Sequence, residues 1–157
     1  MKQKISLTVN GEFITTTVEP RLSLADFLRQ RLHLTATHLG CEHGVCGACT
    51  ILIDGEPARS CIALAISLEG ADITTLEGLA DDPAMETIKT AFHEKHGLQC
   101  GFCTPGMLIS TRDFLKRTPH PSQSAVRGAL SGNLCRCTGY QGIVRAVLRA
   151  AEDLKTR

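Results

Sequence analysis

The chain has 157 residues, of which 17 are basic, 16 are acidic and 43% are hydrophobic. This length suits one ordinary domain or two small ones, and the near-balanced charge offers no concentrated basic face of the kind that binds nucleic acid. No stretch reaches the roughly 18 apolar residues of a membrane span, and the N-terminus does not resemble a secretory signal. We therefore expect a cytoplasmic protein that binds neither nucleic acid nor a membrane.

The first elements expected are two strands and a helix. Apolar residues alternate over 5–9, and Asn10-Gly11 then favours a type I′ hairpin turn into a second strand over 13–18. Ser23 is a candidate N-cap, because an apolar helical stripe follows it as far as Leu32.

A loop rich in glycine and cysteine follows over 40–49. Residues 50–53 then predict a short strand, and Asp54-Gly55 predicts a second hairpin turn. A weaker strand is expected over 72–76. These elements predict a small mixed sheet with one helix.

The pattern changes to helices near residue 80. Asp82 is a candidate cap for a helix that begins with Pro83. Proline is tolerated there because the N–H of the first helical residue has no intrahelical partner in any case. Thr104-Pro105 repeats this pattern of a cap followed by proline, and Ser122 is a candidate cap for a third helix. A fourth helix is expected from about Gln141 to Lys155.

The fold class predicted from these patterns is α+β. A sheet domain is expected over residues 1–76, a linker over 77–82 and a four-helix domain over 83–157.

The chain contains 8 cysteines, and in a reducing cytoplasm such a density indicates metal ligands more than disulfides. Cys41, Cys46 and Cys49 have the spacing C-x4-C-x2-C, and Cys61 follows after a predicted hairpin. This is the spacing of plant-type [2Fe–2S] ferredoxins. Glycines in the loop, Gly44 and Gly47 among them, allow tight turns whose N–H groups can point at sulfur.

The alternatives for this group are a zinc site and unligated core thiols. Zinc ligands usually come as C-x2-C pairs, and only one such pair occurs here. We expect His43 to be a solvent-facing loop residue and not a ligand.

A second cysteine group lies in the helical half. Cys100 and Cys103 form a C-x2-C pair around Gly101, and Cys135 and Cys137 form a C-x-C pair. Each pair precedes a predicted helix N-terminus, where partial positive charge suits an anionic cluster. On spacing alone a zinc site or a thiol–disulfide pair stays open. Arg136 either offsets cluster charge or is a solvated surface residue.

The segments CEHGVCGACT, GLQCGFCTPGM and GNLCRCTGYQGI resemble the small iron–sulfur subunit of molybdenum hydroxylases of the xanthine dehydrogenase and aldehyde oxidoreductase class. The resemblance implies a β-grasp ferredoxin domain followed by a four-helix bundle, with two [2Fe–2S] clusters. One cluster would be held by Cys41, Cys46, Cys49 and Cys61, and the other by Cys100, Cys103, Cys135 and Cys137.

The resemblance also implies partners. A large subunit would carry molybdenum on molybdopterin, in its cytosine dinucleotide form, and a medium subunit would carry FAD. Electrons would pass from molybdenum through the helical-domain cluster and the ferredoxin-type cluster to FAD. Gln99 and Cys137 would approach the pterin, Gly44, Gly47 and Gly101 would supply backbone around the clusters, and the complex is expected to be a dimer of heterotrimers.

The implied activity is that of a hydroxylase or dehydrogenase acting on an aldehyde or an N-heteroaromatic compound, with the substrate site outside this chain. Three alternatives remain open. A reductive member of the 4-hydroxybenzoyl-CoA reductase type would run electrons the other way, a free-standing ferredoxin would shuttle between enzymes, and a zinc-stabilised interaction module would have no redox role. A second domain and a net charge of +1 argue against the free ferredoxin.

Overall fold

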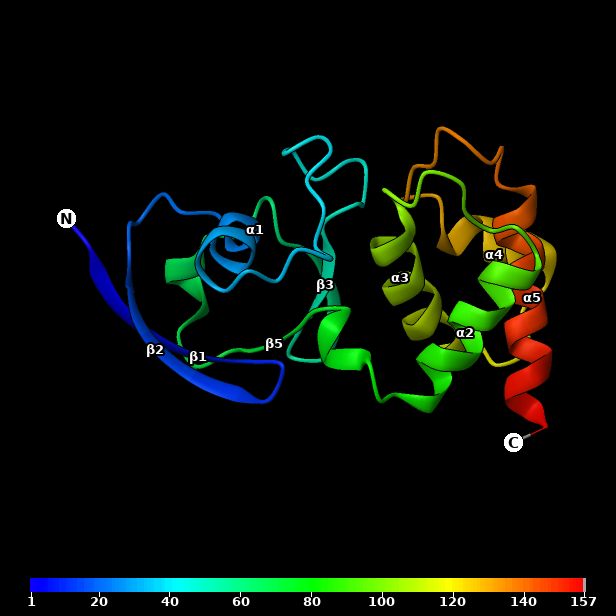
Figure 1. Cartoon of the computed structure of the whole chain (residues 1–157), viewed down its shortest axis with the longest axis horizontal. Coiled ribbons are helices and arrows are strands. Elements are labelled where there is room, and N and C mark those ends of the chain that lie inside the picture. The colour runs from blue at the N-terminus through cyan, green and yellow to red at the C-terminus, as the bar shows by residue number, and fades with distance from the viewer. Residues whose placement is uncertain (157) are drawn as a thin grey trace.

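The computed structural model describes residues 1–156 and is mixed α/β, with a sheet in the N-terminal half and helices in the C-terminal half. Figure 1 shows the two halves side by side, with the N-terminus at one end of the molecule and α5 at the other. Within residues 1–156, no helix combines the length and the apolar character needed to cross a membrane.

The sheet has five strands in the order β2-β1-β5-β3-β4. β1 pairs antiparallel with β2 and parallel with β5, whereas β3 pairs antiparallel with both β4 and β5. The strands are β1 (Gln3–Val9), β2 (Glu12–Val18), β3 (Thr50–Ile53), β4 (Glu56–Arg59) and β5 (Asp72–Thr74).

Both predicted hairpins are confirmed. Asn10 and Gly11 have φ angles of 51° and 82°, and Asp54 and Gly55 have the same pair of values. A type I′ turn requires positive φ at both central residues. The second hairpin matters for function because it returns the chain toward the loop that precedes β3.

The predicted first helix is shorter than a regular α-helix. Ser23 caps it as expected, since its hydroxyl accepts the Asp26 N–H at 3.0 Å. The helix consists of α1 (Leu24–Asp26) and continues as a π-helical turn, η1 (Phe27–Arg31). Its apolar residues enter the sheet core, whose largest fully buried members are Leu7, Leu24, Phe27, Leu28, Ile51 and Ile73.

Four helices form the C-terminal half: α2 (Pro83–Glu94), α3 (Thr104–Arg117), α4 (Gln123–Ala129) and α5 (Gln141–Lys155). Ser122 caps α4 as predicted, accepting the Ala125 N–H at 3.2 Å. The expected cap at Thr104 is wrong by one residue. Cys103 has helical backbone angles and is itself the N-cap of α3, so that Thr104 is the first helical residue.

The segment 77–82 is packed against both halves. It contains a 3₁₀ turn, η3 (Glu77–Leu79), and a second such turn, η2 (Ala65–Leu68), lies before β5. Leu79 is buried in the helical core. Asp82 ends the segment and caps α2.

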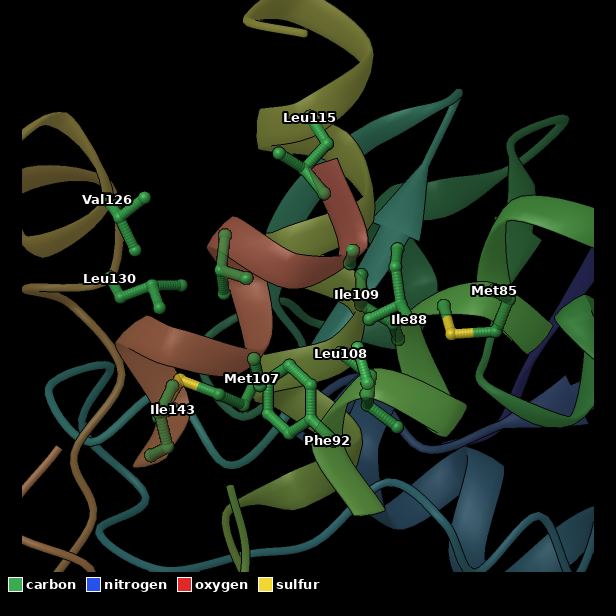
Figure 2. Packing of buried hydrophobic residues seen from close by; sticks show 14 of the residues in the cluster. Met85, Ile88, Phe92, Met107, Leu108, Ile109, Leu115, Val126, Leu130 and Ile143 are labelled. Carbon is green, nitrogen blue, oxygen red and sulfur yellow. The ribbon is translucent and has the colours of Figure 1, made fainter. Parts of the chain in front are cut away.

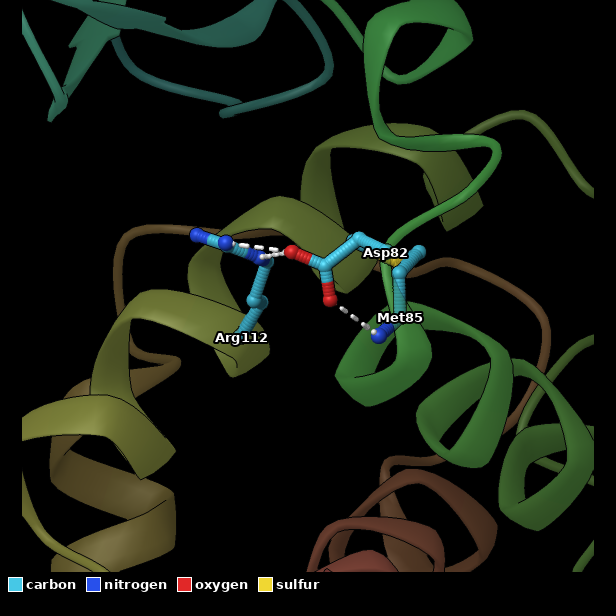
Figure 3. A network of polar contacts seen from close by, with 3 residues as sticks. All are labelled: Asp82, Met85 and Arg112. Carbon is cyan, nitrogen blue, oxygen red and sulfur yellow. Dashed lines mark hydrogen bonds and ion pairs between the residues drawn. The ribbon is translucent and has the colours of Figure 1, made fainter.

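Asp82 joins α2 to α3 (Figure 3). Its carboxylate accepts the Met85 N–H at 2.9 Å and forms an ion pair with Arg112, whose Nε lies 2.8 Å away. Burial alone would raise the pKa of Asp82, but the hydrogen bonds from Arg112 and Met85 outweigh it and lower the pKa below the ordinary value. Asp82 is therefore charged throughout the neutral range.

The helical core draws buried residues from each of α2, α3, α4 and α5, as Figure 2 shows for Ile88, Phe92, Met107, Val126 and Ile143 among others. β3 connects this core to the sheet core. Leu52 packs into the helical core and Ile51 into the sheet core. Because side chains alternate along a strand, β3 is covered on both faces, and α3 lies against it.

Candidate iron–sulfur sites

The first cysteine group is formed by the loop before β3 and the turn after β4. Its sulfurs are arranged in two pairs. The Cys46 N–H donates to the Cys41 sulfur at 3.3 Å, and the thiols of these two residues interact. The Cys61 thiol contacts that of Cys49, so the β3–β4 hairpin returns the fourth cysteine to the loop.

The electrostatics of this group differ between Cys41 and Cys61. Backbone N–H groups of Cys46 and His43 lower the pKa of Cys41 to about 6. Burial and the neighbouring Cys49 raise the pKa of Cys61 to about 11. The backbone therefore already favours an anionic sulfur at Cys41. His43 is exposed, and its ring contacts the Cys41 carbonyl and not a sulfur.

The second cysteine group lies where two loops meet at the starts of α3 and α5. Here too the sulfurs form two pairs. The Cys137 and Cys100 sulfurs are 3.4 Å apart, and the Cys103 thiol interacts with that of Cys135. Cys135 is buried and Cys103 is partly buried, whereas Cys100 and Cys137 are exposed.

In this group too, nearby hydrogen-bond donors lower thiol pKa values that burial raises. Burial and Cys135 raise the pKa of Cys103 to about 12. Burial would also raise the pKa of Cys135, but hydrogen bonds from the hydroxyl and the N–H of Thr138 lower it overall. The Phe102 N–H, 3.5 Å from the sulfur, lowers the pKa of Cys100.

One cavity of about 250 Å³ separates the two groups. It is lined by Cys41 and Cys46 from the first group and by all four cysteines of the second. A backbone hydrogen bond of 2.8 Å runs from the Leu134 N–H to the Cys46 carbonyl. The two cysteine groups are therefore neighbours, although they are distant in the sequence.

Polar contacts hold this junction together. The Asn133 side chain, 3% exposed, donates to the Gly47 carbonyl at 3.2 Å and accepts the Ser110 hydroxyl at 3.0 Å. Arg59 donates to the Gly132 carbonyl at 2.6 Å and also bonds Thr50. The sheet half and the helical half are thus fixed relative to each other beside the cavity.

The arrangement of the sulfurs fits binuclear clusters. All eight cysteines are free thiols. In residues 1–156, no three His, Cys, Asp or Glu side chains gather around a single ion position. A [2Fe–2S] cluster uses four thiolates, two on each iron, and each group offers its four sulfurs as two contacting pairs.

The remaining predicted site residues lie on the loops around these groups. Gly44, Gly47 and Gly101 have φ angles of 83°, 76° and 81°. Gln99 is exposed and directly precedes Cys100, whose sulfur contacts that of Cys137. Arg136 is exposed and lines the cavity.

Sequence reasoning missed the residues that support the sites. Asn133 and Thr138 stand inside the segment GNLCRCTGYQGI and were assigned no role, and Arg59 belongs to a strand far from it. For Asn133 and Thr138, the closeness of both residues to Cys135 and Cys137 in the sequence was the signal that could have indicated a supporting role. Nothing in the local sequence marks Arg59, because its partner at Gly132 is distant in the chain.

Two protein families match the chain. One, described as a 2Fe-2S iron-sulfur cluster binding domain, covers residues 7–80, and the other, a [2Fe-2S] binding domain, covers residues 75–148. Each family match contains one complete cysteine group.

Curated relatives match along almost the whole chain. The caffeine dehydrogenase subunit gamma of Pseudomonas sp. (strain CBB1) is 58% identical over 91% of this chain and 87% of that protein. The nicotine 6-hydroxylase small subunit of Paenarthrobacter nicotinovorans is 53% identical over 94% of this chain and 88% of that protein.

Solved structures share the fold. A chain of quinoline 2-oxidoreductase from Pseudomonas putida 86 has a TM-score of 0.91 and 49% identity, covering 99% of this chain and 97% of that one. The aldehyde oxidoreductase from Desulfovibrio gigas has a TM-score of 0.87 and 38% identity, covering 98% of this chain but 17% of that one.

The fold and the paired cysteines define a protein with two [2Fe–2S] binding domains, one built around a sheet and one from helices. Its relatives are subunits of oxidoreductases. The chain belongs to the family of small iron–sulfur subunits of molybdenum hydroxylases, and its role is electron transfer within an oxidoreductase.

Proposed function

We propose that this chain relays electrons between a molybdenum cofactor in a large partner subunit and FAD in a medium subunit. The observation that carries the proposal is the cavity shared by the two cysteine groups, together with the hydrogen bond from Leu134 to Cys46. When bound, each [2Fe–2S] cluster accepts and releases one electron at a time. The chain's own residues hold the clusters, order their surroundings and keep them adjacent.

The ligand assignment follows the two groups. Cys41, Cys46, Cys49 and Cys61 hold the ferredoxin-type cluster, and Cys100, Cys103, Cys135 and Cys137 hold the helical-domain cluster. Two contacting pairs of sulfurs in each group support this assignment. Backbone N–H groups near Cys41 and Cys100 stabilise negative charge on sulfur.

The domain organisation is part of the same proposal. We assign residues 1–76 to a β-grasp domain, 83–157 to a four-helix bundle and 77–82 to the linker, with residue 157 outside the part of the chain that the structure describes. A mixed five-stranded sheet with one helical segment supports the first assignment. The shared core of α2, α3, α4 and α5 supports the second.

The two sites face different partners. Cys100 and Cys137 are exposed beside Gln99, which suits close approach of molybdopterin, in its cytosine dinucleotide form, from the large subunit. Val45 and Ile62 beside the first group are 56% and 63% exposed and suit contact with the FAD subunit. The assembly proposed is a dimer of such heterotrimers.

We propose an N-heteroaromatic compound as the substrate class, with an aldehyde as the second candidate. The named activities of the relatives support this order. Proteins named for caffeine, nicotine and quinoline are 58%, 53% and 49% identical to this chain, whereas the aldehyde oxidoreductase is 38% identical. The substrate itself would bind on the large subunit.

The test is to purify the chain from its source with its partners attached and to record EPR spectra after reduction with dithionite. Two distinct [2Fe–2S] signals that relax differently with temperature, together with a molybdenum signal and larger subunits, are the expected result. A single cluster signal would leave a ferredoxin. Zinc in place of iron would leave a colourless interaction module, and either outcome would overturn the proposal.

A further inference from the structure

The Thr138 side chain lies against a ligand of the second cysteine group. Its hydroxyl oxygen is 3.1 Å from the Cys135 sulfur, and the same oxygen accepts the Tyr140 N–H at 3.1 Å. The Tyr140 hydroxyl in turn accepts the Cys135 N–H at 3.0 Å. The turn from Cys135 to Tyr140 is therefore closed by hydrogen bonds between its own residues.

The direction of the contact between Thr138 and sulfur follows from counting protons. A cysteine that ligates metal is a thiolate and carries no proton. A threonine hydroxyl has one proton and can accept as well. Because the Tyr140 N–H already occupies an acceptor position on Thr138, the hydroxyl proton is free to point at the Cys135 sulfur.

The backbone N–H groups of Thr138 and Cys137 also contact this sulfur, so the Thr138 hydroxyl adds to backbone donors that a side-chain substitution leaves in place. The Cys135 N–H is engaged by the Tyr140 hydroxyl. Gly139, between Thr138 and Tyr140, has a φ of 64°, and the chain turns there so that the Tyr140 N–H reaches the Thr138 hydroxyl. Cys135 is 7% exposed, and in such surroundings a hydrogen bond acts more strongly than it does in water.

We propose that the Thr138 hydroxyl donates a hydrogen bond to the Cys135 sulfur and thereby raises the reduction potential of the helical-domain cluster. The proposal rests on the proposed function, because it requires a cluster at Cys100, Cys103, Cys135 and Cys137. Reduction adds one negative charge to the cluster. The partial positive charge of the hydroxyl proton stabilises the reduced state more than the oxidised one, and hydrogen bonds to sulfur are an established control of such potentials.

The consequence is a bias in how electrons distribute between the two clusters. The Thr138 hydroxyl contacts a sulfur of the second group, and its other hydrogen bond, from the Tyr140 N–H, lies within the same turn. Removing its hydroxyl should therefore lower the potential of the second cluster and leave the first unchanged. We expect the equilibrium of one electron between the clusters to change roughly three- to tenfold, where tenfold corresponds to about 59 mV for one electron.

The experiment compares Thr138→Val with Thr138→Ser in the intact complex. Valine keeps the shape of threonine but lacks the donor, and serine keeps the donor. The two cluster potentials are measured by redox titration followed by EPR, where each cluster gives its own signal. The expected result is a lower potential for the second cluster in T138V, a near wild-type value in T138S, and no change at the first cluster in either variant.

Other outcomes overturn the proposal in distinguishable ways. Equal potentials in T138V and wild type, with both clusters present, would remove Thr138 from potential control and leave the proposed function intact. If T138V and Thr138→Ala both lack the second cluster while T138S retains it, the hydroxyl serves assembly and not potential. A single cluster signal in the wild-type complex would refute the proposed function and this inference together.

Discussion

The Leu134 N–H donates a hydrogen bond of 2.8 Å to the Cys46 carbonyl oxygen. Cys46 belongs to the first cysteine group, and Leu134 is bonded directly to Cys135 of the second. A route along the backbone from the Cys46 sulfur to the Cys135 sulfur therefore contains one non-covalent step. The contacts around this hydrogen bond hold the two groups at a fixed separation. Substitutions at Asn133 and Gly47 measure how much these contacts stabilise the protein.

Asn133→Ala should destabilise the protein at the junction. Asn133 is buried and bonds Gly47 and Ser110 on opposite sides. Its removal deletes both hydrogen bonds across the junction, which costs about 1–3 kcal/mol in total, or about 2–4 °C in Tm for each kcal/mol. Thermal loss of the cluster absorption measures this. Ser131→Ala, at an exposed neighbour, is the matched control and should stay within about 0.5 kcal/mol of wild type.

Gly47→Ala should destabilise the protein more than the same substitution at a glycine with open space around it. A Cβ at Gly47 would lie 2.4 Å from the Gly132 carbonyl oxygen, and the φ of 76° also disfavours a side chain. Backbone strain and the clash together should cost about 2–5 kcal/mol. Gly11→Ala isolates the strain, because Gly11 has a φ of 82° and nothing within 4 Å of a Cβ. Equal Tm values for the two variants would contradict a tight junction.

Asp82→Asn should weaken the link between α2 and α3. The variant loses the charge that pairs with Arg112 but keeps an oxygen for the Met85 N–H. We expect a loss of about 1–2 kcal/mol at pH 7. Because the folded pKa of Asp82 is lowered, its contribution is full above the ordinary aspartate pKa of about 4 and disappears only as the pH falls through the folded value.

The loss of stability caused by Asp82→Asn should therefore not depend on pH in the neutral range. The difference in Tm between wild type and Asp82→Asn should be the same at pH 8 and at pH 5.5. Thermal unfolding in buffers of constant ionic strength provides the measurement. A difference that shrinks between these two pH values would mean that Asp82 already takes up protons there, against the lowered pKa.

Single ligand substitutions should remove one cluster at a time. Cys61→Ser should abolish the ferredoxin-type signal, and Cys135→Ser the helical-domain signal, because each residue contacts a sulfur of its own group. Iron content should fall from about four to about two per chain in each variant. Iron analysis and EPR of the reduced complexes check this. Loss of both signals in one variant would show that the two sites do not assemble independently.

Local sequence was sufficient to predict several elements. Asn10-Gly11 and Asp54-Gly55 predicted both hairpins, and Ser23, Asp82 and Ser122 cap helices where expected. These features depend on residues a few positions apart. The predicted cap of α3 was wrong by one residue. Cys103, on the loop of the second cysteine group, has helical backbone angles and is the N-cap in place of Thr104.

The sequence by itself therefore determined the class of protein. Cysteine spacing and the resemblance of three short segments indicated two iron–sulfur sites, and hydrophobic periodicity indicated a sheet followed by helices. Only the tertiary structure decided that the two sites share one cavity, that Leu134 bonds Cys46 and that Thr138 faces the Cys135 sulfur. The first two of these relationships join segments far apart in the chain, and the third depends on the hydrogen-bonded turn from Cys135 to Tyr140. Such features arise from packing and backbone geometry, which residue spacing does not encode.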